Sequence, residues 1–265
     1  MIHLFALLSL LLCGVCYTGF QNSSHFHNTS NRRSLLLLVF GGALLLRLLL
    51  AYTTHGFSND IACFAAWADR IFTLGPGQFY SAEMFTDYPP GFMYVLYLIG
   101  ALRSLLQIPY YSDLHILLLK LPAILCDIAC GFLLYREAVK RLHFSDLQGI
   151  FAASAYLFQP AVILNSSCWG QVDSVYTLMI ILMCLFLMKG NLLPAYAVYG
   201  LGVLLKPQML IFTPVLLAGI WDHVFLQDFS WRKFFYNLCG GLVVICGMLL
   251  LCAPFGLTAA ISQYT

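Results

Sequence analysis

Three aspartates and one lysine stand out because each lies among polar or rigid neighbours in a largely apolar chain. They are Asp60 in SND, Asp87 in TDYPPG, Asp173 in WGQVDS and Lys206 in LLKPQ. Charged side chains at the edge of a membrane cost free energy unless they are paired or hydrated. Their presence therefore indicates a functional site, although each residue also has an ordinary structural interpretation.

The structural interpretations differ from residue to residue. Asp60 would lie in the first turn of a helix, where the helix dipole favours an acid. Asp87 could start a turn before the two prolines that follow it, and Asp173 could belong to the cap of the next helix. Lys206 could extend its ammonium group to the membrane interface. Both interpretations stay open for all four residues.

An acid and a cation at an outer membrane edge suit glycosyl transfer from a lipid-phosphate sugar. One carboxylate would accept the proton of the acceptor hydroxyl, and a cation would stabilise the departing phosphate. Asp60 is placed for the first task, and Lys206 or Lys120 for the second. The phosphate leaves without protonation, so the second acid of a glycoside hydrolase is not needed. The remaining acids would hold sugar hydroxyls.

The composition indicates which class of protein positions these residues. Of the 265 residues, 61% are hydrophobic and 9% are charged, and the mean hydropathy is +0.86. Soluble domains carry about 25% charged residues. We therefore predict an all-α, polytopic membrane protein. The formal net charge of +2 gives no reason to expect nucleic acid as a partner.

Basic residues orient the expected spans, because cytoplasmic loops carry an excess of lysine and arginine. The basic stretches are Arg32–Arg33, REAVKRLH at 136–143 and WRK at 231–233. The expected spans are 34–53, 114–135, 147–164, 174–188 and 234–252, with two short helical halves around LLKPQ in 192–220. On this path, the loops at 54–91 and 165–173 face outside, and so does LLKPQ.

Two segments of this path need separate treatment. In the external loop, residues 59–74 are expected to form a helix on the membrane surface. Its apolar stripe consists of Ile61, Phe64, Ala65, Ala68, Ile71 and Phe72. The apolar run at 92–107 either crosses the membrane or re-enters it. We favour re-entry, because another crossing would put the REAVKRLH stretch outside.

The chain is expected to divide into an N-terminal apolar segment with a cytoplasmic loop, 1–33, and a transmembrane domain, 34–265. The apolar stretch at 3–17 is either a signal peptide or a first span. We favour the span because no basic region precedes it and no clear cleavage site follows it. The chain stops soon after its last exit, so we expect the domain to be incomplete at its C-terminus.

Three further charges are expected inside the membrane. Lys120 and Asp127 are seven residues apart on one predicted helix, so they share a face at a separation of about 10 Å. Arg47 lies near the outer end of its predicted span. Pairing with neighbouring helices and a direct functional role are both open for these residues.

The order of the motifs SND, DYPPG, LKLPAILCDIA, NSSCWGQVDS and LLKPQ resembles the GT-C superfamily of integral membrane glycosyltransferases. The resemblance covers roughly residues 40–220 and is closest to the bacterial Gpi18-like mannosyltransferases. It implies a helix bundle with juxtamembrane helices in the first large external loop. Members of this superfamily usually have more spans than we count here.

The resemblance also implies a reaction and a set of site residues. A sugar, mannose by resemblance, would move with inversion from a polyprenyl-phosphate donor to a lipid, glycan or protein acceptor on the extracellular or lumenal face. Asp60 and Asp87 would be catalytic. The substrate-binding residues would be Tyr88, Trp169, Gln171, Asp173, Lys206, Gln208 and Lys120. No cofactor is expected; the acids could hold a divalent metal ion through their oxygens, but no spacing demands one. Membrane lipids are the remaining partners.

The two prolines after Tyr88 have a place in this hypothesis. Pro89 and Pro90 would fix the chain where it enters the membrane and hold Asp87 at the mouth of the cavity. Tyr88 would lie at the level of the lipid headgroups, which suits its amphipathic ring.

Two other classes of protein compete with the enzyme. A transporter or glycolipid flippase also has broken helices and intramembrane charges, although its charges usually lie near the midplane. A non-catalytic subunit that scaffolds another glycosylation enzyme is the third possibility. One external cavity shared by Asp60, Asp87, Asp173 and Lys206 would favour the enzyme.

Overall fold

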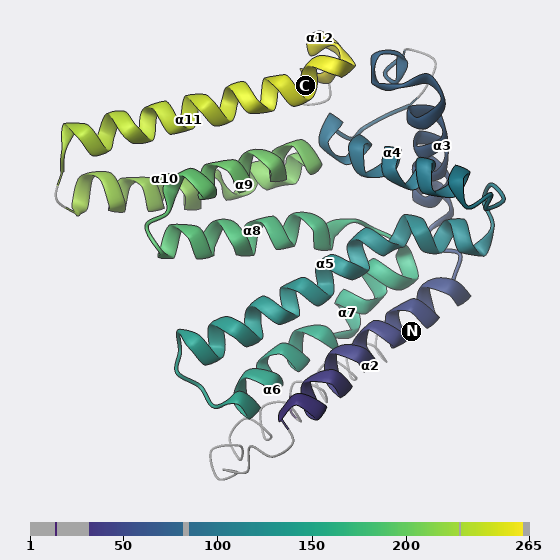
Figure 1. Ribbon diagram of the computed structural model, residues 1–265, viewed down its shortest axis with the longest axis horizontal. Helices are drawn as coiled ribbons and strands as arrows, with labels where there is room; N and C mark the ends of the chain where they lie inside the picture. Colours follow the sequence, from purple (N-terminus) through teal and green to yellow (C-terminus); the bar gives the residue numbers. More distant parts are fainter. Residues whose placement is uncertain (1–13, 15–31, 82–84, 228, 262–265) are drawn as a thin grey trace. The chain divides into compact units, whose positions relative to one another are not determined.

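The computed structural model describes the chain except residues 1–13, 15–31, 82–84, 228 and 262–265, and every regular element in the described part is a helix (Figure 1). Two compact units share these elements. The first unit is Met1–Ile61 with Tyr111–Ser174, and the second is Ala62–Tyr110 with Val175–Thr265. The span expected at 3–17 lies outside the described residues, apart from Gly14.

The α-helices are α2 (Arg32–Thr53), α3 (Ser58–Leu74), α4 (Pro90–Leu105), α5 (Asp113–Lys140), α6 (Asp146–Leu157), α7 (Pro160–Ile163), α8 (Asp173–Met188), α9 (Leu192–Leu205), α10 (Thr213–Trp221), α11 (Trp231–Cys252) and α12 (Leu257–Ile261). Short 3-10 segments occupy Pro76–Gln78, Pro207–Phe212 and Ala253–Phe255. The turns Leu164–Trp169 and Asp222–Leu226 are π-helical.

Four described helices are long and apolar enough to cross a membrane: Arg32–Thr53, Asp113–Lys140, Pro207–Leu226 and Trp231–Phe255. A fifth arises if Asp146–Leu157 and Pro160–Trp169, which meet at 52°, count as one broken span. The predicted all-α, polytopic fold is therefore confirmed, and the protein is a multi-pass membrane protein.

In the first unit, α2 and α5 run in opposite directions (Figure 1). Their polar ends meet where Arg32 donates to the Tyr135 hydroxyl at 2.8 Å and forms an ion pair with Asp146 at 3.2 Å. Tyr135 in turn donates to Asp146 at 2.8 Å. The start of α2, the end of α5 and the start of α6 therefore lie together. This places the Arg32–Arg33 and REAVKRLH stretches at one end, as the distribution of basic residues predicts.

The expected span at 147–164 is wrong in its detail, because the helix breaks near Pro160. Proline has no amide hydrogen, and it disfavours helical backbone in the residue before it. Gln159 accordingly takes extended dihedral angles, φ −63° and ψ 119°. The predicted loop at 165–173 is also mostly helical, since the π-helical turn continues to Trp169 and only then gives way to Gly170.

Helix α3 confirms the expected helix at 59–74; its first four residues belong to the first unit and the rest to the second. Five of the six residues of its predicted apolar stripe are buried, and Phe72 is half-buried. Trp67, which the periodicity places on the polar face, is also buried, at 2% exposure. Its ring lies against Phe64 and Tyr88, and its indole nitrogen donates to the Phe85 carbonyl at 3.0 Å. Neighbouring aromatic residues therefore cover part of the helix face that the periodicity predicts to be exposed to water.

Lys206 breaks the chain between α9 and the helix that follows it. Its backbone is extended, with φ −153° and ψ 124°, and Pro207 begins the next helical segment. The predicted break is thus confirmed. The expectation of two short halves is half wrong, because α9 has 14 residues whereas Pro207–Leu226 has 20 and is long enough to span.

Candidate functional site

Asp60 lies in the first turn of α3 and holds two side chains of the loop that precedes α8. The indole Nε1 of Trp169 donates to Asp60 Oδ2 at 3.1 Å, and Gln171 Nε2 donates to the same oxygen. The backbone N–H of Phe57 donates to the Trp169 carbonyl at 2.8 Å, and the two rings lie 5.3 Å apart. Three of the predicted site residues are therefore brought together in the first unit.

Gly170 allows this loop to approach α3 so closely. Its φ is +89°, a conformation that residues with a Cβ rarely adopt. A Cβ at this position would lie 2.6 Å from Ile61 Cδ1. Glycine is therefore required twice here, once for the turn and once for the contact.

Asp173, three residues after Gly170, is bound within its own loop. Asn165 Nδ2 donates to Asp173 Oδ2 at 3.0 Å, while the Asn165 carbonyl accepts the N–H groups of Gly170 and Gln171. Two buried oxygens in this region, Asn165 Oδ1 and Gln171 Oε1, have no hydrogen-bond partner among the described residues. A water molecule or a donor group of a ligand would satisfy them.

Lys120 is fully buried and caps the end of α2. Its ammonium donates to the carbonyls of Thr54 at 2.7 Å, Ser167 at 3.0 Å and Ala51 at 3.3 Å, and to the Thr54 hydroxyl at 3.1 Å. The last carbonyls of a helix lack intrahelical partners and favour a nearby cation. The geometry therefore gives Lys120 a structural role between α2, α5 and the π-helical turn.

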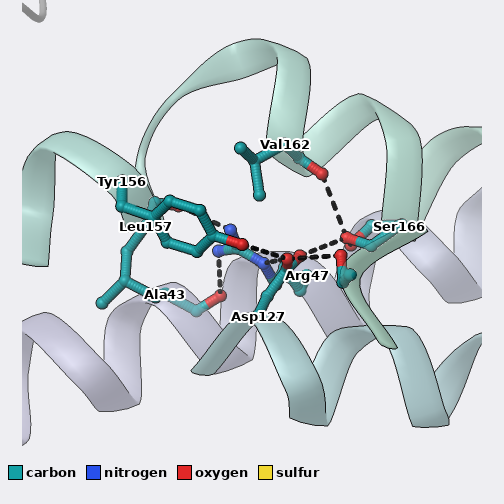
Figure 2. A network of polar contacts seen from close by, with 9 residues as sticks. Ala43, Arg47, Asp127, Tyr156, Leu157, Val162 and Ser166 are labelled. Atoms are coloured by element: carbon teal, nitrogen blue, oxygen red, sulfur yellow. Dashed lines mark hydrogen bonds and ion pairs between the residues drawn. The ribbon is translucent and has the colours of Figure 1, made fainter. Parts of the chain in front are cut away.

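A second buried charge centre joins the same helices (Figure 2). Arg47 Nε lies 3.2 Å from Asp127 Oδ2, and both side chains have no exposed surface. The other guanidinium nitrogens donate to the carbonyls of Leu157, at 2.7 Å, and Ala43, at 3.3 Å. Of the two roles left open by the sequence, pairing is therefore the one observed.

The hydroxyl partners of Asp127 could not be found from the sequence. Ser174, Ser166 and Tyr156 donate to its carboxylate at 2.5, 2.6 and 3.2 Å. They come from three elements, and although Ser166 and Ser174 lie in the NSSCWGQVDS motif, nothing in that motif indicates Asp127 as their partner. Their hydrogen bonds satisfy the remaining lone pairs of the buried carboxylate, which is the condition for burying an ion pair.

In the second unit, two more of the predicted site residues, Lys206 and Tyr88, lie close together. The Lys206 ammonium lies 5.8 Å from the ring centroid of Tyr88 and 5.5 Å from that of Tyr176, within cation–π range. Tyr88 is 8% exposed and packs against the rings of Phe64 and Phe92. These aromatic neighbours bury Tyr88, and its expected position at the level of the lipid headgroups stays a prediction.

Asp87 and Gln208, the remaining site candidates, are exposed on the second unit. Asp60 and Asp173 belong to the first unit, so the convergence of all four charges on one cavity stays a prediction. In the described ranges, no group of three or more His, Cys, Asp or Glu side chains could hold a metal ion.

The comparison with known families decides between the hypotheses. Residues 32–264 match the family described as GPI transamidase subunit PIG-U. The chain belongs to the PIG-U family. No curated protein matches the chain significantly.

Membership of the PIG-U family corrects four predictions. The assignment to the GT-C mannosyltransferases is wrong, and so are the sugar-transfer reaction, the glycosyltransferase class and the polyprenyl-phosphate sugar donor as partner. The catalytic roles of Asp60 and Asp87 lose the reaction on which they depended. The motifs misled because polar residues at a membrane edge also serve structure, as the contacts of Asp60 with Trp169 and Gln171 illustrate.

Proposed function

We propose that this chain is a membrane-embedded, non-catalytic subunit of a GPI transamidase, the complex that attaches proteins to GPI anchors. The observation that carries the proposal is the match of residues 32–264 to the PIG-U family. The match includes every helix from α2 to α12, so it concerns the whole helical scaffold and not a single motif.

The contacts of the intramembrane charges support a scaffolding role. Arg47 and Asp127 neutralise each other, and Lys120 is surrounded by carbonyl groups. A catalytic charge must reach a substrate, whereas these three are enclosed by α2, α5 and the π-helical turn. Their effect is to fix the arrangement of helices that other subunits would contact.

The end of the first unit that carries Asp60 and Trp169 would face the lumen in this proposal. Arg32, Arg136 and Lys140 lie at the other end, and basic residues favour the cytoplasmic side. Trp169 is 50% exposed although Asp60 fixes its orientation. A large, held aromatic side chain of this kind is typical of the centre of a protein interface. We therefore assign this end to contacts with lumenal parts of the complex.

Affinity purification from the organism's own cells tests the proposal. A tagged copy of the full chain should recover the other transamidase subunits in a complex that survives mild detergent. The same purification with Trp169→Ala should recover less of the complex, while the chain itself stays folded. Recovery of the folded chain without any transamidase subunit would overturn the proposal.

A further inference from the structure

The second unit contains two adjoining hollows between its last helices. One has an almost entirely apolar lining, and the lining of the other includes basic residues. The first is a cavity of about 400 Å³ between α9, α10 and α11. Its lining is almost entirely apolar and includes Leu216, Phe234, Gly241 and Met248. This volume falls in the range of about 300–1,000 Å³ that is usual for small-molecule sites.

The second hollow lies at one end of the same helices, and its lining combines apolar residues with basic and polar ones. It has a volume of about 740 Å³ and is lined by residues of the α8–α9 turn and of the start of α11, with His223, Arg232 and Lys233 among them. The α8–α9 and α10–α11 turns lie at the same end of the helices (Figure 1). Asn237 lines both hollows, so the basic one opens next to the apolar one.

The charge at this end is positive on balance. Lys233 donates to the Gln227 carbonyl at 3.2 Å, so its ammonium group lies beside the α10–α11 turn. The nearby acid, Asp222, accepts a hydrogen bond from Gln227 Nε2 at 2.6 Å. Arg232 and Lys233 line this hollow with His223, and no Asp or Glu is among the described residues that line it.

The chemistry of the two hollows fits an amphiphile with a negatively charged head. Lysine and arginine are the usual partners of phosphate groups, and an apolar cavity suits a hydrocarbon chain. Basic residues near the cytoplasmic surface attract the anionic lipids of that leaflet. Helix α11 is apolar and largely exposed, and it is long enough to cross the bilayer, so lipid has access to the groove.

We propose that this region is a binding site for an anionic phospholipid. The phosphate would lie against Arg232 and Lys233, and one acyl chain would occupy the cavity beside Gly241 and Met248. Asn237, at the junction, would contact the glycerol region. The site goes beyond the proposed function, because it requires no other transamidase subunit.

Native mass spectrometry of the full chain, purified with its partners and placed in nanodiscs, tests this site. The probes are palmitoyl-oleoyl phosphatidylserine and phosphatidylcholine in equal amounts. The wild type should retain phosphatidylserine over phosphatidylcholine by about tenfold. The Arg232→Gln/Lys233→Gln variant should lose this preference, whereas Lys140→Gln/Arg141→Gln, with the same loss of charge on α5 and the residue after it, should keep it.

A second pair of variants tests the groove and does not depend on the basic residues. A Cβ at Gly241 would meet no atom within 4 Å, so Gly241→Leu should fill the cavity without disturbing the helix. Gly247 on the same helix also has open space around it but does not line the cavity, so Gly247→Leu is the control. Gly241→Leu should abolish the retained lipid and Gly247→Leu should not.

Three results of the retention measurements would overturn the lipid site. They are equal retention of the two lipids by the wild type, an unchanged preference in Arg232→Gln/Lys233→Gln, and unchanged retention in Gly241→Leu. If inorganic phosphate displaced all of the retained phosphatidylserine, the site would bind anions in general and would not be a lipid site. A helix of another subunit found in the groove would also exclude it.

Discussion

Arg47 of α2 and Asp127 of α5 are 80 residues apart in the sequence, yet they form an ion pair of 3.2 Å in which neither side chain is exposed. Every partner of this pair belongs to the first unit. Serine and tyrosine hydroxyls donate further hydrogen bonds to the carboxylate, and backbone carbonyls accept hydrogen bonds from the guanidinium. The pair therefore fixes the position of α2 on α5 and of the bent helix on both.

Removing one member of this pair should destabilise the first unit strongly. Asp127→Ala leaves a buried guanidinium without its charge partner, and such changes cost about 3–5 kcal/mol. Arg32→Gln is the matched control, because its ion pair with Asp146 is partly exposed, and pairs of that kind contribute about 0–1 kcal/mol. Thermal unfolding in detergent, followed by size-exclusion chromatography with fluorescence detection, measures both. Equal losses in the two variants would contradict the structural role of the buried pair.

Lys120 should hold the end of α2 against the π-helical turn. Lys120→Met keeps the length of the side chain but leaves several buried carbonyls without a donor, at a cost of about 1–3 kcal/mol each when they stay dry. We expect faster amide hydrogen exchange at residues 51–57 and little change in α11. Unaltered exchange at 51–57 would show that the ammonium is not needed there.

Gly170 should tolerate substitution poorly. Gly170→Ala combines a left-handed backbone, φ +89° and ψ 21°, with a Cβ placed 2.6 Å from Ile61 Cδ1. The backbone conformation alone should cost about 1–2 kcal/mol, and the close contact should add to this cost. Ile61→Val removes the Cδ1 atom, so Gly170→Ala should lose less stability in an Ile61→Val background than in the wild type. Equal losses in the two backgrounds, measured by thermal unfolding, would contradict the described geometry.

Much of the helical scaffold follows from the sequence by simple physical rules. Long apolar runs predict α2, α5 and α11, and the periodicity of the SNDIACF segment predicts α3. The break at Lys206 follows from Pro207, and the common end of the two basic stretches follows from their charge. The same proline rule applies at Pro160, where the apolar run concealed the bend.

The interactions of the charged residues could not be predicted with the same success. Arg47 and Asp127 were recognised as unusual, but pairing depends on how α2 crosses α5, which no local pattern encodes. Ser166 and Ser174 are common residues whose hydroxyls matter only because they point at Asp127. Trp67 lies on the polar face of the helical wheel, yet the rings of Phe64 and Tyr88 pack against it.

The sequence motifs favour the wrong function because polar residues at a membrane edge can serve either a reaction or the structure. Asp60, Trp169 and Gln171 do lie together, as a binding site would require. Their mutual hydrogen bonds, however, close a loop against α3 and do not imply a reaction. Only the match over residues 32–264 separated a transamidase subunit from a sugar transferase.

The central claim is that the chain serves a GPI transamidase without a catalytic carboxylate of its own. The direct measurement is flow cytometry of GPI-anchored proteins on cells in which the gene has been disrupted and a variant supplied. Wild type and Asp60→Asn/Asp87→Asn should restore surface anchoring to within about twofold of each other, since a factor of two is well under 1 kcal/mol. No restoration by the wild type, or a loss of more than about tenfold in a double variant that still assembles, would contradict the account.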